Sequence, residues 1–487
     1  MGVLLAMGCG GDRSPIRIPG PALWIGEESR ELSTRELRSL SRNGVQDLFV
    51  EVGSLRWKEK EPTLERLSWP DLPERPAAVL VIRGLWPAPT PKPRTASEAL
   101  IPRFETLLAE ASQQGLDPLG IHLDLAVSGG EDSTRSYGRF LERLADGVPG
   151  RWSWSATVDP EAPGTEELVE AADFVVAFVY GTRPGGERPG PGSRSFAEAR
   201  TLEDRLASWD KPHLTGIVTL GTARLRSTGE TVTRTDLTQL AWDRALEAGH
   251  GFTLEAADRQ HYRFEARRRT FVAGQPVEKG TEVEATGTSS AHVAELLRIL
   301  RRDSGTSYRG PVFYRLPGVQ EGLSLEVDQL VHALEGPEAA RPGLEVGVSG
   351  RRMGPRLWDL AVSLRETRGE PTDLGFVDAN WVDLVLGGSG TIIEVEPGNF
   401  YRYELLRRSE GALEKTLRRP DVVRLYAPYV PGHGEVRSGP IRIRVADRPR
   451  VTVRGSFLAP YGETLDVGPR TLVPGAAPEE GTEVTSE

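Results

Sequence analysis

The sequence predicts an α/β plus β protein: a (β/α)8, TIM-like barrel with a β insertion, followed by a C-terminal β-sandwich of the immunoglobulin-like type. Between about residues 21 and 335, short apolar strands alternate with helical patterns, which is typical of parallel βα units. No G-x-G-x-x-G motif follows the first strand, so the sequence does not indicate an open dinucleotide-binding sheet. After Pro342 the strands are short and separated by Gly, Pro and Asn, a pattern that favours a sandwich.

Runs of apolar residues bounded by turn residues predict the barrel strands, and helical periodicity predicts the helices between them. The predicted strands are Ala22 to Gly26, Asp47 to Gly53, Ala78 to Gly84, Gly120 to Val127, Trp152 to Asp159, Asp173 to Tyr180, His213 to Leu220 and Pro311 to Leu316. The predicted helices include Glu98 to Gln114, Ser136 to Ala145, Ala197 to Trp209, Leu237 to Ala248 and Ala291 to Arg301.

The same patterns predict the domain boundaries. Residues 1–19 form an N-terminal signal or lipoprotein segment and linker, residues 20–335 the barrel, and residues 341–460 the sandwich. Strand-like alternation places the β insertion at about 252–287. Residues 461–487 are acidic and carry little to bury, so we expect a largely disordered tail.

Charge and motif content exclude several classes of protein. The chain has 60 Lys and Arg against 70 Asp and Glu, a net charge of −10, which argues against a nucleic-acid partner because such partners need a basic face. No H-E-x-x-H, phosphate-loop or G-x-S-x-G motif is present, so the sequence predicts no metal and no cofactor. It also contains no apolar stretch of about 18 residues that would predict a membrane-spanning helix.

Cys9 is the only cysteine, which excludes intrachain disulfides. It follows the small and apolar run from Val3 to Gly8 and precedes Gly10-Gly11-Asp12, as at a bacterial lipoprotein processing site. The preceding residues lack a basic start, so we expect an upstream start codon. The sequence therefore predicts a lipidated Cys9 and attachment to the cell envelope; the alternative is an incidental thiol in a cytoplasmic protein.

Strand alternation predicts which side chains enter the barrel lumen. Ile121, Leu123 and Leu125 form the helix-facing set of the fourth strand, so His122 and Asp124 point inward. The same rule, applied to the other strands, directs the following charged side chains inward: Glu51, Arg83, Asp159 and Arg315.

A charged lumen has two interpretations. The carboxylates of Asp124, Glu51 and Asp159 are candidate catalytic acids and bases, with Arg83 and Arg315 binding a polyhydroxylated ligand. At ~4.8 Å per strand, Asp124 and Glu51 lie ~7–10 Å apart, which overlaps the ~6.5–9.5 Å of inverting glycoside hydrolysis. The alternative is a buried ion-pair network that fixes strand register.

Three further residues are candidates for ligand binding. His122 lies deeper than Asp124 and is either a ligand contact or a hydrogen-bonded core histidine. Trp24 and Trp86 are possible aromatic platforms for a sugar, with packing as the alternative.

Three strand motifs resemble a bacterial family of uncharacterised, exported proteins with a glycoside-hydrolase-like barrel. The motifs are Gly120-Ile121-His122-Leu123-Asp124, Ser155-Ala156-Thr157-Val158 and Phe313-Tyr314-Arg315-Leu316-Pro317. The resemblance spans about residues 20–335 and implies the barrel fold, with the β-rich C-terminal part as a recurrent companion. Members commonly show G-I-x-[IL]-D-x-D; Asp124 matches the first acid, but Ala126 stands where the second would be.

The expected function is that of an envelope-associated, carbohydrate-directed protein with a polysaccharide or glycan as partner. Whether it hydrolyses the glycan is left open. An enzyme needs two acids that reach the scissile bond, whereas a binding protein tolerates the loss of one. The alternative is a non-catalytic glycan-binding or structural envelope lipoprotein with a degenerate barrel site.

Overall fold

The computed structural model describes most of the chain, which forms two compact units. The first contains β1 to β8 with their helices, together with β16; the second contains β9 to β15, α8 and β17 to β27. The described residues are 16–58, 61–148, 152–179, 196–220, 222–227, 230–235, 252–257, 261–272, 275–286, 288–303, 305–318, 324–336, 341–373, 380–409, 412–427, 429–459 and 464–473.

Eight parallel strands of the first unit close into a barrel. The order is β1-β16-β8-β7-β6-β5-β4-β2, and β1 also pairs with β2, which completes the ring. All eight predicted strands are confirmed, with ends that differ by a few residues. Their bounds are β1 Ala22–Ile25, β2 Asp47–Lys58, β4 Ala77–Trp86, β5 Asp117–Val127, β6 Ser153–Thr157, β7 Phe174–Phe178, β8 His213–Val218 and β16 Tyr308–Tyr314.

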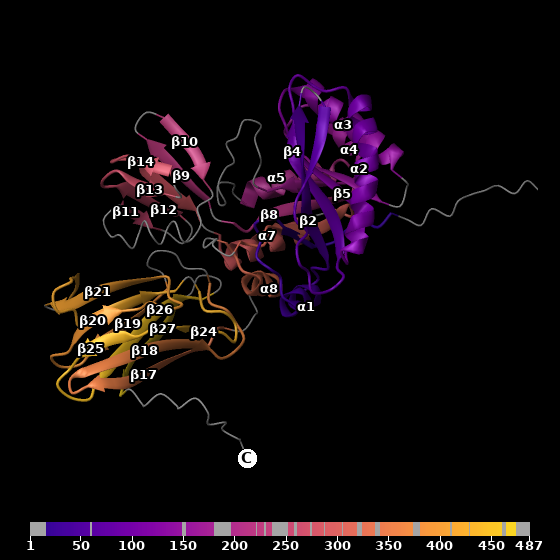
Figure 1. Ribbon diagram of the computed structural model, residues 1–487. Helices are drawn as coiled ribbons and strands as arrows, with labels where there is room; N and C mark the ends of the chain where they lie inside the picture. The colour runs from indigo at the N-terminus through magenta and orange to yellow at the C-terminus, as the bar shows by residue number, and fades with distance from the viewer. Residues whose placement is uncertain are drawn as a thin grey trace, which may run out of the picture. The chain divides into compact units, whose positions relative to one another are not determined.

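Helices cover the outside of this barrel (Figure 1). They are α1 Thr34–Arg42, α2 Pro93–Gln113, α3 Glu131–Gly147, α4 Thr165–Ala171, α5 Phe196–Ala207 and the end of α7 Ser290–Asp303. Sequence periodicity missed α1 and α4, which are short; α1 buries only Leu40. The predicted helix Leu237 to Ala248 lies outside the described residues.

The predicted strand parity is confirmed. His122 of β5 contacts the rings of Trp24 and Phe49 inside the barrel, whereas Trp154 of β6 packs outward on Phe104 of α2. The lumen core consists of apolar side chains from most of the strands: Ala22, Trp24, Phe49, Val79, Val81, Leu119, Phe174, Val176, Leu214 and Val312. The lower barrel is therefore a packed core rather than a channel.

β3 (Glu61–Arg66) was not predicted and forms an antiparallel hairpin with the extended end of β2. Its sequence, EPTLER, contains a single buried apolar residue, Leu64, so no hydrophobic alternation marks it as a strand.

The β insertion is larger than predicted. It includes a five-stranded antiparallel sheet of order β10-β9-β15-β12-β11 and the small hairpin β13-β14. The prediction of 252–287 missed β9 and β10, whose Arg- and Thr-rich sequences show little apolar alternation. The bounds are β9 Thr222–Ser227, β10 Glu230–Thr235, β11 Phe252–Ala257, β12 His261–Ala266, β13 Thr270–Val272, β14 Gln275–Val277 and β15 Glu282–Thr286.

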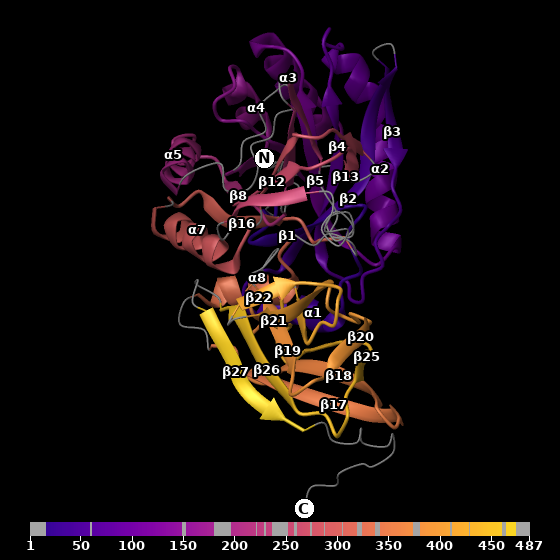
Figure 2. The same ribbon diagram turned by 90° about the vertical axis from the view of Figure 1, so that its left-hand side faces the viewer.

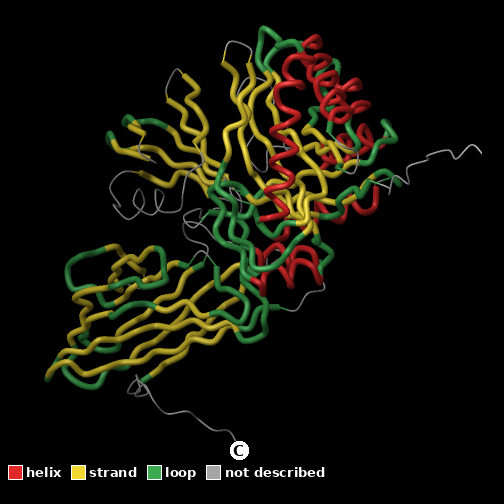
Figure 3. The backbone as a smooth tube through the Cα atoms, turned by 45° about the vertical axis from the view of Figure 1, so that its right-hand side comes forward, coloured by secondary structure: helices red, strands yellow, loops and turns green. Residues whose placement is uncertain are grey.

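After α8 (Val327–Glu335), which the sequence did not predict, two antiparallel sheets enclose a common apolar core (Figures 2 and 3). One sheet has the order β17-β18-β25-β20 with β24 beside β18, and the other the order β22-β21-β23-β19-β26-β27. The bounds are β17 Leu344–Gly354, β18 Leu357–Glu366, β19 Trp381–Leu386, β20 Thr391–Val395, β21 Arg402–Ser409, β22 Ala412–Lys415, β23 Val422–Tyr426, β24 Glu435–Arg437, β25 Ile441–Arg444, β26 Val451–Leu458 and β27 Thr464–Leu472.

The last strand corrects the predicted tail. β27 lies inside the stretch 461–487 that the sequence predicts as largely disordered, and it pairs with β26. It is an edge strand whose buried residue is Val467, and it contains Gly468 and Pro469, so its sequence resembles a loop. The immunoglobulin-like topology remains a prediction. None of the described helices has the length and apolar character needed to cross a membrane.

Gly120 is required where β5 approaches β6. A Cβ atom at this position would lie 2.0 Å from the carbonyl oxygen of Ser153, a backbone atom that cannot rotate away. We expect Gly120→Ala to lower the free energy of unfolding by about 2–4 kcal/mol, because overpacking against backbone forces the strands apart. Denaturant titration of the purified protein measures this loss.

Gly130 provides the matched control, because a Cβ there meets no atom within 4 Å. Gly130→Ala should change the free energy of unfolding by less than about 1 kcal/mol. Equal stability of the two variants would contradict the close packing of β5 on β6.

Candidate functional site

Three charged side chains of adjacent barrel strands meet just beyond the apolar lumen core, toward the carboxyl ends of the strands: Glu51 of β2, Arg83 of β4 and Asp124 of β5. Arg83 Nη1 lies 3.4 Å from Glu51 Oε1, and Arg83 Nε lies 3.6 Å from Asp124 Oδ2. The exposed fraction of the side chain is 36% for Arg83, 19% for Asp124 and 4% for Glu51. We call these residues the charged trio; the arginine bridges a buried carboxylate and a partly exposed one.

The trio depends on strand register. Arg83 and Asp124 are directly paired between β4 and β5. Between β2 and β4 the register shifts after Glu51, because Val52 forms an irregularity. Such a bulge re-aims the side chains that follow it. Glu51 precedes the bulge and points into the barrel as parity predicts, whereas the residues after the bulge continue into the hairpin with β3.

Trp24 holds Glu51 rather than forming a platform. Its Nε1 donates a hydrogen bond of 2.8 Å to Glu51 Oε1, and its ring is fully buried. The backbone N–H of Glu27 donates to the other oxygen, Oε2, at 3.3 Å. Both oxygens of this buried carboxylate are thus bonded, which fixes its orientation.

Arg315 lies close to Gly26 and to this carboxylate. A Cβ at Gly26 would lie 3.1 Å from Arg315 Cδ and 3.3 Å from Glu51 Oε2, so a larger residue there would require these side chains to shift by a few tenths of an ångström. Arg315 Nη2 lies 3.8 Å from Glu28 Oε2. The structure thus brings Arg315 to the edge of the trio.

His122 lies below the trio, completely buried. Its Nδ1 and Nε2 each form a 2.9 Å hydrogen bond, with the hydroxyls of Ser155 and Thr157 on β6. Burial lowers the pKa of His122 to about 4, although the negative charge of Asp124 acts in the opposite direction. The imidazole is therefore neutral at physiological pH and serves as a hydrogen-bonded core histidine.

Asp159 and Trp86 lie elsewhere. Asp159 Oδ1 accepts a hydrogen bond from the backbone N–H of Glu161, two residues on, so it shapes the turn after β6. Trp86 is fully buried against Tyr137 and Phe140 of α3. The position of Asp159 does not support the predicted catalytic role. The position of Trp86 does not support the predicted role as a platform for a sugar, so the candidate site includes neither residue. Cys9 lies outside the described residues.

Two aromatic side chains that the sequence analysis did not select are better placed. Phe178 and Tyr314 end β7 and β16, both are partly buried, and their rings lie 5.3 Å apart at 82°. Tyr314 also lies 5.1 Å from the Trp24 ring, which connects it to Glu51. Strand alternation could have identified both residues, since each is the last lumen-facing residue of its strand.

A cation between two carboxylates compensates their charge, so the trio is unsuited to a metal ion and instead presents donors and acceptors to a polar ligand. The guanidinium donates and the carboxylates accept. Polar side chains at the carboxyl-terminal face of such a barrel lie where barrel enzymes bind their substrates.

Three comparisons with known proteins were made. Neither a protein-family model nor a curated protein matches the sequence. Similar solved structures include the spore cortex-lytic enzyme SleL of Bacillus megaterium (14% identity, 66% of this chain and 75% of that one, TM-score 0.40). Others are a chitinase from Bacteroides thetaiotaomicron (11%, 66% and 99%, 0.40) and chitinase ChiA74 from Bacillus thuringiensis (9%, 92% and 100%, 0.38). At these identities and TM-scores, the site geometry alone carries the proposal below.

Acid should destabilise the barrel through His122. Because the folded-state pKa is about 4 and the unfolded value is 6.5, the unfolded chain takes up the proton first. The contribution of the neutral His122 to the free energy of unfolding is complete above pH 6.5. It is lost as the pH falls toward 4, which lowers the free energy of unfolding by roughly 3 kcal/mol at most.

His122→Gln removes this titration and keeps an amide that can bond Ser155 or Thr157. The difference in unfolding free energy between pH 7 and pH 4.5, measured by urea denaturation, should shrink in the variant. An unchanged difference would show that other groups cause the acid sensitivity.

Proposed function

We propose that this protein is a carbohydrate-directed barrel protein that binds a glycan at the charged trio and does not hydrolyse it. The observation that carries the proposal is the position of Arg83, which is about one third exposed and lies between Glu51 and Asp124 on the carboxyl-terminal side of the lumen core.

The chemistry of the site favours a polyhydroxylated ligand. Sugar hydroxyls both donate and accept hydrogen bonds, so they can pair with the carboxylate of Asp124 and the guanidinium of Arg83 at once. The partly buried rings of Phe178 and Tyr314 add an apolar, aromatic surface, and a few polar groups among aromatic side chains are typical of small-ligand sites.

The same geometry argues against hydrolysis. In inverting hydrolysis the two acids flank the glycosidic bond and leave room for a water molecule. Here the Arg83 guanidinium lies between Glu51 and Asp124, and Trp24 and Glu27 already hold the oxygens of Glu51. Asp159, the other candidate partner for Asp124, bonds to its own turn. Binding can use these side chains as they lie, whereas hydrolysis would require Arg83 to leave the space between the two acids and Glu51 to give up its hydrogen bonds.

We also propose that the protein acts at the cell envelope through a lipid on Cys9. The support is the sequence context of this cysteine, with small and apolar residues before it and Gly10-Gly11-Asp12 after it. An envelope location would bring the barrel to extracellular polysaccharides.

Asp124→Asn and Arg83→Ala should each weaken retention on an insoluble glycan, with chitin, peptidoglycan and cellulose as probes. Each variant removes one charged hydrogen-bonding group, which corresponds to roughly 1.5–3 kcal/mol, or about 10- to 100-fold in affinity. Pull-down isotherms on each polymer, with circular dichroism as the check on folding, measure the effect.

Arg38→Ala is the matched control, because Arg38 pairs with Glu74 on an exposed surface away from the trio. It should bind as the wild type does. Release of reducing ends by the wild type, abolished in Asp124→Asn, would show hydrolysis and overturn the binding role. Wild-type retention by both trio variants would remove the trio from the site.

Expression of the gene in a bacterial host tests the lipid anchor. The wild type should fractionate with membranes and incorporate labelled fatty acid, whereas Cys9→Ala should do neither. Identical behaviour of the two proteins in the soluble fraction would contradict the anchor.

A further inference from the structure

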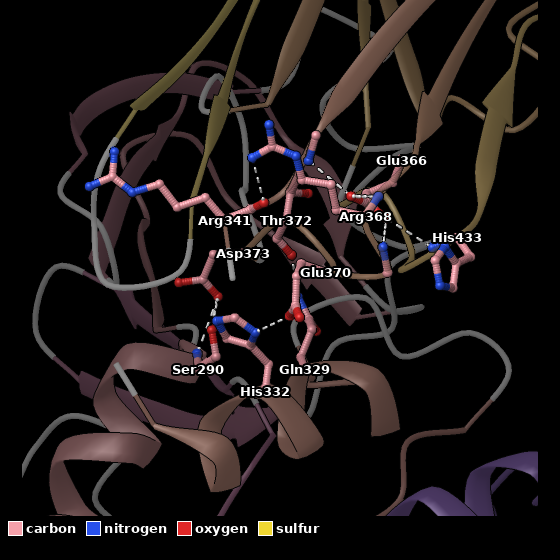
Figure 4. A network of polar contacts seen from close by, with 12 residues as sticks. Ser290, Gln329, His332, Arg341, Glu366, Arg368, Glu370, Thr372, Asp373 and His433 are labelled. Atoms are coloured by element: carbon pink, nitrogen blue, oxygen red, sulfur yellow. Dashed lines mark hydrogen bonds and ion pairs between the residues drawn. The ribbon is translucent and has the colours of Figure 1, made fainter. Parts of the chain in front are cut away.

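A cluster of histidine and carboxylates lies in the second unit, away from the charged trio in the sequence. His332 and Glu335 belong to the last turn of α8, and Glu370 follows β18. The potential ligand atoms of these three residues all lie within 4.8 Å of one another. His332 Nδ1 lies 2.7 Å from Glu370 Oε2, and the two side chains face each other in Figure 4.

We propose that His332, Glu335 and Glu370 bind a zinc ion. Imidazole nitrogen and carboxylate oxygen are both zinc ligands, at about 2.0–2.2 Å. Ligand atoms of a tetrahedral site at these bond lengths lie roughly 3.3–3.5 Å apart, so the cluster is close to the required geometry before any metal enters.

The charge of the cluster is the second observation. Glu335 and Glu370 bring two carboxylates close together, and within the described residues neither forms an ion pair with a lysine or an arginine. Like charges at this spacing repel, and the repulsion is relieved by a cation between them. A divalent ion supplies that charge and uses the histidine as its third ligand.

The elements that carry the ligands are held in place. His332 is 2% exposed, so its ring has little freedom. The segment that carries Glu370 is fixed two residues further on, where the Thr372 backbone and hydroxyl bond Val430 and the Gln329 amide donates to the Thr372 carbonyl. Glu335 is exposed at the end of the helix and can move to complete the site.

With three protein ligands, a tetrahedral ion keeps a fourth position for water. The ion would also link the end of α8 to the segment after β18. Zinc should therefore raise the thermal stability of the second unit, because a metal bound only by the folded state shifts the folding equilibrium.

The test is titration of untagged, chelator-treated full-length protein with Zn²⁺, followed by calorimetry and by the thermal unfolding midpoint. We expect saturable binding of one ion at micromolar Zn²⁺, a rise in the midpoint, and no comparable effect of Mg²⁺, which prefers all-oxygen octahedral sites. Glu335→Gln should weaken zinc binding by at least about tenfold, since the loss of a residue that only supports a metal ligand already lowers metal affinity by about 10- to 100-fold.

Glu335 is exposed, so Glu335→Gln should fold normally and keep the result interpretable if His332→Ala does not fold. His433→Asn is the control for incidental binding by a histidine, because His433 is exposed and outside the cluster, and asparagine suits its positive φ of 54°. It should bind zinc as the wild type does. Absence of saturable binding, or equal affinity in Glu335→Gln and the wild type, would overturn the proposal.

Discussion

The closure of the parallel sheet by β1 is the constraint on which the barrel site depends. Ala22 pairs with Val312 of β16 on one side and with Asp47 of β2 on the other. The four buried residues of β1 therefore join the two ends of the sheet. Asp47 also accepts a hydrogen bond from the Gly20 backbone, which fixes the chain as it enters β1. Closure gives the sheet an inside, and only then does the alternation of side chains define a lumen.

Closure also explains how one lumen holds an apolar core at one depth and charged groups at another. Deep in the lumen the rings of Trp24, Phe49 and His122 pack on one another, and a neutral histidine fits there because two hydroxyls satisfy both its nitrogens. Near the carboxyl ends water reaches the side chains, so Arg83 and Asp124 remain solvated on one side. The ion-pair and ligand-binding interpretations of the charged lumen therefore describe the same residues: the pairs that fix the register also present groups to a ligand.

The second unit relies on a different constraint. Its sandwich encloses an apolar core to which both sheets contribute, for example Val362 of one sheet and Leu384 of the other. Polar contacts attach the segment after β18 to neighbouring elements: Asp373 accepts from the Ser290 backbone and hydroxyl at the start of α7, and Gln329 of α8 donates to Thr372 (Figure 4). Buried and satisfied bonds of this kind specify one arrangement, because an unmade bond there is costly.

The sequence by itself determined the eight barrel strands and the faces of those that carry the site. Buried parallel strands are nearly continuous apolar runs, and the period of two along β5 assigned His122 and Asp124 to the lumen without any knowledge of their neighbours. Strands β3 and β27 could not be recognised in this way, since an edge or hairpin strand with few buried residues leaves no such pattern. The sequences of β9 and β10 also show little apolar alternation.

Only the tertiary structure decided how the lumen residues combine. Local pattern says that Glu51, Arg83 and Asp124 point inward, but the distances among them follow from strand register and from the irregularity at Val52. Tertiary contacts also distinguish the two buried tryptophans, since Trp24 bonds Glu51 whereas Trp86 packs under α3. The cluster of His332 and Glu370 joins residues 38 positions apart in the chain. Contacts between distant segments are set by the packing of whole elements, and the spacing of residues along the sequence does not contain them.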